Sequence, residues 1–209
     1  MPARLRPTAP IAADAVLVGD PGRALLLAQE LLAEPKMSNH ARGLWGYSGR
    51  TPAGDELTIQ STGMGGPSAA LVLADLAKLG VRRAVRVGTC AAAEPGLEPG
   101  AIVVVGEAVS GGAAASPDPG LTSRLRDELG GGAAARVASL DDPHADLPAG
   151  VAAADLQTAT LLARGGDLGL AVAAVLIVER SAAGERIADA ALEDAAKRAG
   201  QAAAHVLST

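Results

Sequence analysis

Aromatic side chains are almost absent from this 209-residue chain, which has no Phe and only Trp45 and Tyr47. Proteins that bind a nucleobase often stack it on an aromatic ring, and this chain has very few rings to offer. Trp45 and Tyr47 alternate along one expected strand, so we interpret them as core or subunit-interface residues.

Cysteine and histidine are scarce as well. Cys90 is the only cysteine, which excludes an intramolecular disulfide and a metal site built from several thiolates. His40, His144 and His205 are too scattered to indicate a zinc site, so we expect no metal and no organic cofactor. A nucleophilic thiol needs a nearby base, and no motif supplies one, so we interpret Cys90 as a core residue.

The chain lacks an excess of positive charge and a long apolar run. Its 18 basic and 23 acidic residues give a formal net charge of -5, which predicts no nucleic-acid partner. No uncharged apolar run reaches the roughly 18–20 residues of a membrane span. The apolar stretch near the N-terminus is short and interrupted by Asp14, unlike a signal peptide. We therefore expect a cytoplasmic protein without membrane contact.

Hydrophobic residues make up 49% of the chain, and they occur in short runs separated by Gly-containing turns. Uniformly apolar strands that alternate with helices predict a three-layer αβα sandwich with a central mixed, largely parallel sheet. We expect one domain over residues 1–209, with Asp20 as N-cap and Pro21 as first residue of the first helix. The expected strands are 15–18, 44–49, 56–61, 83–88, 101–109, 133–140 and 170–178, and the expected helices are 24–33, 69–79, 119–129, 155–164 and 187–207.

Two turns that follow expected strands are suited to an anion. Residues 19–23 (GDPGR) place free backbone N–H groups and an Arg at a helix start, and residues 86–89 (RVGT) add a second Arg and a hydroxyl. No GxxxxGK[ST] motif is present, and residues 63–68 (GMGGPS) lack the third glycine of the dinucleotide fingerprint. Inorganic phosphate held by several guanidinium groups fits these turns better than a nucleotide does.

Five motifs in order carry a resemblance that covers nearly the whole chain: VGDPGR, NHARGLWGYSG, STGMGGPSAA, VRVGTCAA and GLEPGAIVVV. Together they resemble the nucleoside phosphorylase family of hexameric type, which includes purine nucleoside phosphorylase and uridine phosphorylase. The C-terminal third is more similar to uridine phosphorylase, which has Asn-Arg-Thr where this chain has Glu179-Arg180-Ser181.

This resemblance implies phosphorolysis of a nucleoside, with inorganic phosphate as co-substrate, to a free base and (deoxy)ribose 1-phosphate. It also implies an even-numbered homo-oligomer, a dimer at least and a hexamer by expectation. By motif, Arg86 and Arg180 would be catalytic. The implied sites are Gly19, Arg23, Arg86 and Thr89 for phosphate, with Arg42 contributed by a neighbouring subunit, Met64, Leu156 and Gln157 for the ribose, and Arg180 for the base.

Arg180 stands where purine-type members have an Asp that protonates the leaving base. A guanidinium cannot donate a proton at neutral pH, but it can stabilise an anionic leaving group. The residue therefore favours a pyrimidine nucleoside.

Three departures from the family keep other functions open. Gln157 replaces a ribose-binding Glu, so we expect low turnover on nucleosides and a higher turnover in Gln157→Glu. Alternatively, this stretch is only a helix start with Asp155 as N-cap. Residues 110–148 lack the Gln-x-Arg motif that recognises uracil, which leaves Arg136 and His144 as replacements or as solvated residues. Arg6 lies where the family has a His. The alternatives are a purine nucleoside phosphorylase, a nucleosidase of the same superfamily, and a catalytically weak protein that binds a nucleoside or phosphosugar.

Overall fold

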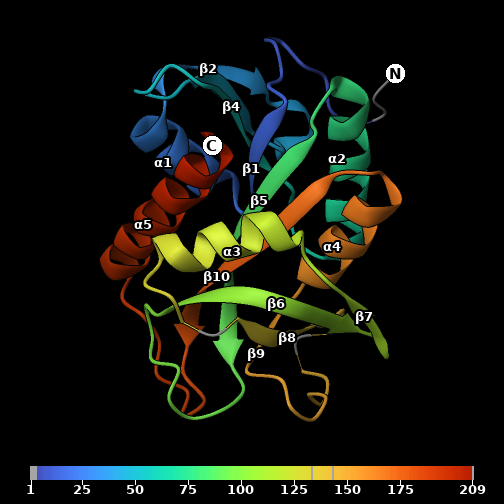
Figure 1. The fold of residues 1–209 in the computed structure, drawn as a ribbon, viewed down its shortest axis with the longest axis vertical. Helices are drawn as coiled ribbons and strands as arrows, with labels where there is room; N and C mark the ends of the chain where they lie inside the picture. Colours follow the sequence, from blue (N-terminus) through green and yellow to red (C-terminus); the bar gives the residue numbers. More distant parts are fainter. Residues whose placement is uncertain (1–3, 133, 143, 209) are drawn as a thin grey trace.

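The computed structural model describes residues 4–132, 134–142 and 144–208. Its core is a ten-stranded mixed sheet with helices on both faces (Figure 1), as the alternation of apolar strands and helices predicts. The strands are β1 (Asp14–Val18), β2 (Ala33–Asn39), β3 (Gly46–Arg50), β4 (Glu56–Ser61), β5 (Arg83–Ala92), β6 (Ile102–Ser110), β7 (Ala113–Ala115), β8 (Ala135–Ser139), β9 (Ala153–Asp155) and β10 (Ala171–Arg180). The helices are α1 (Pro21–Leu31), α2 (Gly66–Leu79), α3 (Pro119–Glu128), α4 (Thr158–Asp167) and α5 (Asp189–Ser208), with a 3-10 turn, η1, at Ala41–Gly43.

The strands at the centre of the sheet, β4, β1, β5 and β10, pair in parallel, whereas β3 and β2 continue antiparallel to one edge. On the other side, β10, β6, β8, β9 and β5 pair in sequence, and β10 also pairs with β5. These pairings close a ring of five strands. The sheet is therefore open at the β2 end and barrel-like at the end that holds β5 and β10.

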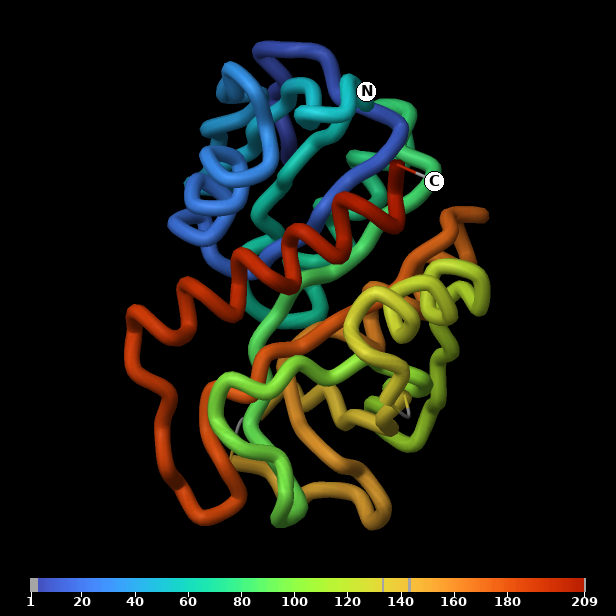
Figure 2. The backbone as a smooth tube through the Cα atoms, turned by 60° about the vertical axis from the view of Figure 1, so that its left-hand side comes forward, coloured from blue at the N-terminus to red at the C-terminus, as the bar shows by residue number. Residues whose placement is uncertain are grey.

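Two apolar cores separate the layers. Side chains of α1, α3 and α5 pack on one face of the sheet, and those of α2 and α4 pack on the other. Figure 2 shows α5 running between α1 and α3. Strand β5 serves both cores, because Val85 and Val87 face the first and Ala84 and Cys90 the second.

Local signals in the sequence predicted most boundaries within a few residues. Asp20 is the N-cap of α1 and accepts the Gly22 N–H at 2.9 Å, with Pro21 as first residue, as expected. The helix expected to reach residue 33 ends at Leu31 instead, and the edge strand β2 follows it. Pro35 and Lys36 are typical of edge strands rather than of central strands, so the sequence pattern did not predict β2.

The expectation of a helix from residue 155 is wrong. Residues 153–155 form β9, and α4 starts at Thr158 with Gln157 as N-cap. Asp155 still accepts the Thr158 N–H, at 3.1 and 3.2 Å from its two oxygens, so it satisfies the helix start from outside the helix.

Two glycines test how tightly the helices pack. A Cβ at Gly200 in α5 would lie 2.7 Å from Leu27 Cδ2, which is fully buried, whereas a Cβ at Gly166 in α4 would meet nothing within 4 Å. Gly200→Ala should lower the free energy of unfolding by about 1 kcal/mol net, because overpacking outweighs the gain in helix propensity. Gly166→Ala should raise it by up to about 1 kcal/mol. Urea unfolding of both variants checks this, and equal gains would mean that the α1–α5 contact is loose.

Candidate active site

A cavity of about 830 Å³ lies at the carboxyl ends of β1, β5 and β10. Ligands of open α/β sheets bind at this edge, so the turns singled out in the sequence meet there. Eight of the nine residues expected at a site line the cavity, namely Gly19, Arg23, Met64, Arg86, Thr89, Leu156, Gln157 and Arg180. Arg42 is the ninth and does not line it.

Arg42 lies in η1 and is exposed. Its φ of 61° is in the left-handed region, which costs a residue other than glycine about 1–3 kcal/mol. The β2–β3 connection thus holds Arg42 away from the cavity of its own chain.

Arg86 is the most deeply buried positive charge of the cavity, with 4% of its side chain exposed. It leaves β5 on the side of α4, where Nη2 donates to Asp155 Oδ2 at 2.9 Å and Nε donates to Thr158 Oγ1 at 2.9 Å. Gly88 leaves the space for this, because a Cβ there would lie 2.5 Å from Arg86 Nη2. The guanidinium is therefore fixed from one side only.

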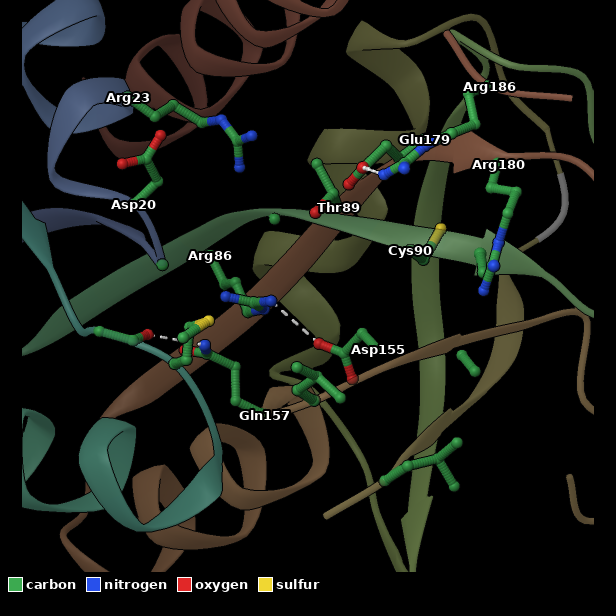
Figure 3. A pocket seen from close by; sticks show the side chains of 18 of the residues that line it. Asp20, Arg23, Arg86, Thr89, Cys90, Asp155, Gln157, Glu179, Arg180 and Arg186 are labelled. Atoms are coloured by element: carbon green, nitrogen blue, oxygen red, sulfur yellow. Dashed lines mark hydrogen bonds and ion pairs between the residues drawn. The ribbon is translucent and has the colours of Figure 1, made fainter. Parts of the chain in front are cut away.

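Asp155 is the partner that the sequence did not reveal. Besides Arg86, its carboxylate accepts hydrogen bonds from the Ser139 hydroxyl and from both the N–H and the hydroxyl of Thr158. All its acceptor positions face the protein, so Asp155 balances the charge of Arg86 and is not free for a ligand. Figure 3 shows the pair at the centre of the cavity.

One nitrogen of the Arg86 guanidinium makes no hydrogen bond to the described residues. Nη1 is buried and has no hydrogen-bond partner among the described residues. A buried donor without an acceptor costs about 1–3 kcal/mol, which an anion in the cavity would recover.

Arg23 adds a second positive charge at the start of α1. Burial lowers the pKa of its guanidinium, Asp20 raises it, and Arg86 lowers it again by repulsion. An anion between two guanidinium groups that repel each other would stabilise both of them.

Gln157 is buried against the turn that begins α2. Its Oε1 accepts from the Thr62 hydroxyl at 2.7 Å, and its Nε2 donates to the Gly63 carbonyl at 3.0 Å. A carbonyl can only accept, so this contact requires an amide at position 157 rather than a carboxylate. The amide thus has a structural role that its identity alone did not indicate.

Two further residues that line the cavity, Glu179 and Arg186, were not given a role by the sequence, whereas His144 was a candidate for base contacts. Glu179 and Arg186 form an ion pair of 2.7 Å at the rim, beside Arg180 (Figure 3), and His144 lies on the loop before β9. Arg136, the other candidate for base contacts, pairs with Glu107 instead and does not line the cavity.

Cys90 also lines the cavity and is 5% exposed. Burial, with a smaller contribution from Asp155, raises the pKa of its thiol to about 12. The thiol is neutral at physiological pH, which agrees with its interpretation as a packing residue.

Comparisons with known proteins place the chain in a family. The family model "Phosphorylase superfamily" matches residues 14–209, so the chain belongs to this superfamily. A DeoD-type purine nucleoside phosphorylase of Oceanobacillus iheyensis is 43% identical over 83 residues, 39% of this chain and 35% of that protein. One of Caldanaerobacter subterraneus is 37% identical over 95 residues, 45% of this chain and 40% of that protein. These alignments span less than half of the relatives' length.

Solved structures confirm the fold. A uridine phosphorylase of Vibrio fischeri superposes with a TM-score of 0.81 at 20% identity, covering 95% of this chain and 92% of that chain. A purine nucleoside phosphorylase of Toxoplasma gondii gives 0.82 at 19% identity, covering 95% and 91%. Both kinds of phosphorylase are thus similar to this chain. No group of three or more metal-ligating side chains occurs in the described ranges, and none of their helices could cross a membrane.

The Arg86–Asp155 pair should stabilise the fold only while both charges are present. Asp155→Asn would leave a buried guanidinium without a counter-charge, at a cost of about 3–5 kcal/mol in the free energy of unfolding. Glu56→Gln is the matched control, because the Arg50–Glu56 pair is 65% and 66% exposed and should contribute less than about 1 kcal/mol. Similar losses in chemical denaturation of the two variants would contradict the description of Asp155 as a buried partner.

The contacts of Gln157 predict that a carboxylate at this position would lower stability, whatever it does to turnover. Gln157→Glu would place a carboxylate oxygen against the Gly63 carbonyl and should lower the free energy of unfolding by about 1–3 kcal/mol. Gln29→Glu, at an exposed position of α1, should change it by less than about 0.5 kcal/mol. A Gln157→Glu protein that is as stable as the parent and faster on nucleosides would show that the original expectation is right.

Proposed function

We propose that the protein catalyses phosphorolysis of a nucleoside, with inorganic phosphate as nucleophile. The observation that carries this proposal is the buried Arg86 Nη1, which has no acceptor among the described residues. Arg23 lines the same cavity as Arg86. A phosphate dianion would accept from both guanidinium groups, from the Thr89 hydroxyl and from the backbone N–H at Gly19. Arg42 would reach this phosphate from a second copy of the chain.

In the proposed reaction, a phosphate oxygen forms a bond to the anomeric carbon of the sugar. The bond from that carbon to the base nitrogen breaks, and its electron pair leaves with the base. The transition state carries positive charge on the sugar, and the bound dianion is at once nucleophile and counter-charge. Met64 and Leu156 would pack against the sugar. The leaving base carries negative charge, which Arg180 would stabilise.

A pyrimidine nucleoside is the first candidate, because Arg180 can stabilise an anion but cannot protonate a purine. Its exposed guanidinium has no ion-pair partner among the described residues. A purine nucleoside is the second candidate. The observation in its favour is Glu179, since its carboxylate lines the same cavity.

The test is base release from uridine and inosine with and without phosphate. Phosphate should be required, and it should bind the free enzyme in calorimetry. Gly88→Ala should weaken that binding by about 1.5–3 kcal/mol, because the new Cβ displaces the Arg86 guanidinium without removing its charge. Gly166→Ala should leave it unchanged. Release of base at the same rate in phosphate-free buffer would instead identify a nucleosidase, and binding without release a catalytically weak protein.

A further inference from the structure

Two fully buried amide side chains flank a glycine near the open edge of the sheet. Gly46 of β3 pairs with Asn39 of β2 on one side and with Gln60 of β4 on the other. Asn39 and Gln60 are both 0% exposed. A Cβ at position 46 would lie 2.3 Å from Gln60 Oε1, so the glycine leaves the space that this amide occupies.

Both amides donate to the backbone of the turn that connects β2 with β3. Asn39 Nδ2 donates to the Leu44 carbonyl and, at 3.4 Å, to the Ala41 carbonyl. Gln60 Nε2 donates to the same Leu44 carbonyl at 2.9 Å and to the Trp45 carbonyl at 3.3 Å. Carbonyls can only accept, so both positions require an N–H donor. Two buried side chains are therefore committed to one short turn.

That turn holds Arg42 in a strained conformation. Arg42 and Gly43 follow each other with φ of 61° and 69°, both in the left-handed region. Glycine adopts this region freely, and a residue with a long side chain stays there only when its surroundings fix it. A glycine at position 42 would form the same turn without strain. The Arg42 side chain is exposed, so the strain is not offset by burial of that side chain in the core.

Asn39 uses the other end of its amide as well. Its Oδ1 accepts the Arg6 N–H at 2.8 Å, and the Thr8 N–H donates to the neighbouring Ser38 carbonyl at 2.8 Å. The segment of residues 6–8 is thus bound to the end of β2, and one amide links this segment to the Arg42 turn.

We propose that Asn39 and Gln60 are positioning residues that hold Arg42 in the conformation in which it binds phosphate in the cavity of a second copy of the chain. This inference rests on the proposed function, in which Arg42 completes the anion site. Without the two amides, the turn would relax from the left-handed region and the guanidinium would spread over many directions. A contact between charges is lost when one partner must be ordered again for each binding event.

The experiment measures the KM for phosphate and kcat in Asn39→Ala, Arg42→Ala and the double variant. Asn39→Ala should raise the KM for phosphate about tenfold with a smaller change in kcat, since about tenfold is the size of one hydrogen bond to a charged group. The double variant should bind phosphate no more weakly than Arg42→Ala, because both changes remove the same contact.

Thr51→Ala is the matched control. Thr51 is buried, and its Oγ1 accepts the Asp55 N–H at 3.2 Å, so it supports the β3–β4 turn as Asn39 supports the β2–β3 turn. This variant should unfold at lower urea concentration than the parent and keep the parent's KM for phosphate.

Arg42→Gly separates positioning from stability. It should raise the urea midpoint of unfolding, because the strain is relieved, and raise the KM for phosphate about tenfold, because the guanidinium is lost. A variant in which both values stay at those of the parent would show that the strained Arg42 has no function in binding, and would overturn the inference.

Failure of this inference can be separated from failure of the proposed function. An unchanged KM for phosphate in Asn39→Ala or Arg42→Ala, or additive losses in the double variant, overturns the inference and leaves phosphorolysis standing. If Asn39→Ala does not fold, Gln60→Met, which keeps the volume and loses the donor, is judged by the same criteria. If no nucleoside is cleaved, the proposed function fails, and calorimetry with inorganic phosphate tests the same variants. Equal weakening in Asn39→Ala and Arg42→Ala supports the inference; unchanged affinity, or no binding by the parent, overturns it.

Discussion

The buried ion pair between Arg86 and Asp155 is the constraint on which the rest of the site depends. Two charges removed from water are tolerated only when hydrogen bonds satisfy their remaining groups, and here Ser139 and Thr158 saturate the carboxylate. That requirement explains why β9 ends at Asp155, why α4 begins three residues later, and why position 88 is a glycine. It also leaves Arg86 Nη1 buried without a hydrogen-bond partner among the described residues.

The sequence predicted those parts of the fold whose signals are local. Apolar runs marked the central strands, and Asp20 with Pro21 marked the start of α1. It could not predict β9, because three residues are too few to show a periodic pattern. The pairing of β9 with β5 and β8 depends on the tertiary structure. The same holds for Asp155, which satisfies the start of α4 only because Arg86 and Ser139 hold it there.

The candidate site was predictable to a similar depth. Gly19, Arg23 and Arg86 follow from the rule that strand ends meet at one edge of the sheet. Glu179 does not, because regular alternation would place it and Arg180 on opposite faces. The pairing of β10 with β5 instead shifts register between Val178 and Arg180, and both Glu179 and Arg180 line the cavity. The sequence shows that Gln157 has an amide where the family has a carboxylate. Only the structure shows that this amide donates to the Gly63 carbonyl.

Two pairs of opposite charges in the cavity, Arg86 with Asp155 and Arg186 with Glu179, differ in how firmly the fold holds them. Arg86 and Asp155 are almost fully buried, so any change there alters folding as well as binding. Glu179, near the end of β10, and Arg186, in the loop that follows it, form a largely exposed ion pair that adds little stability. Substitutions of the exposed pair should therefore alter the rim of the cavity while the buried pair and the core stay intact.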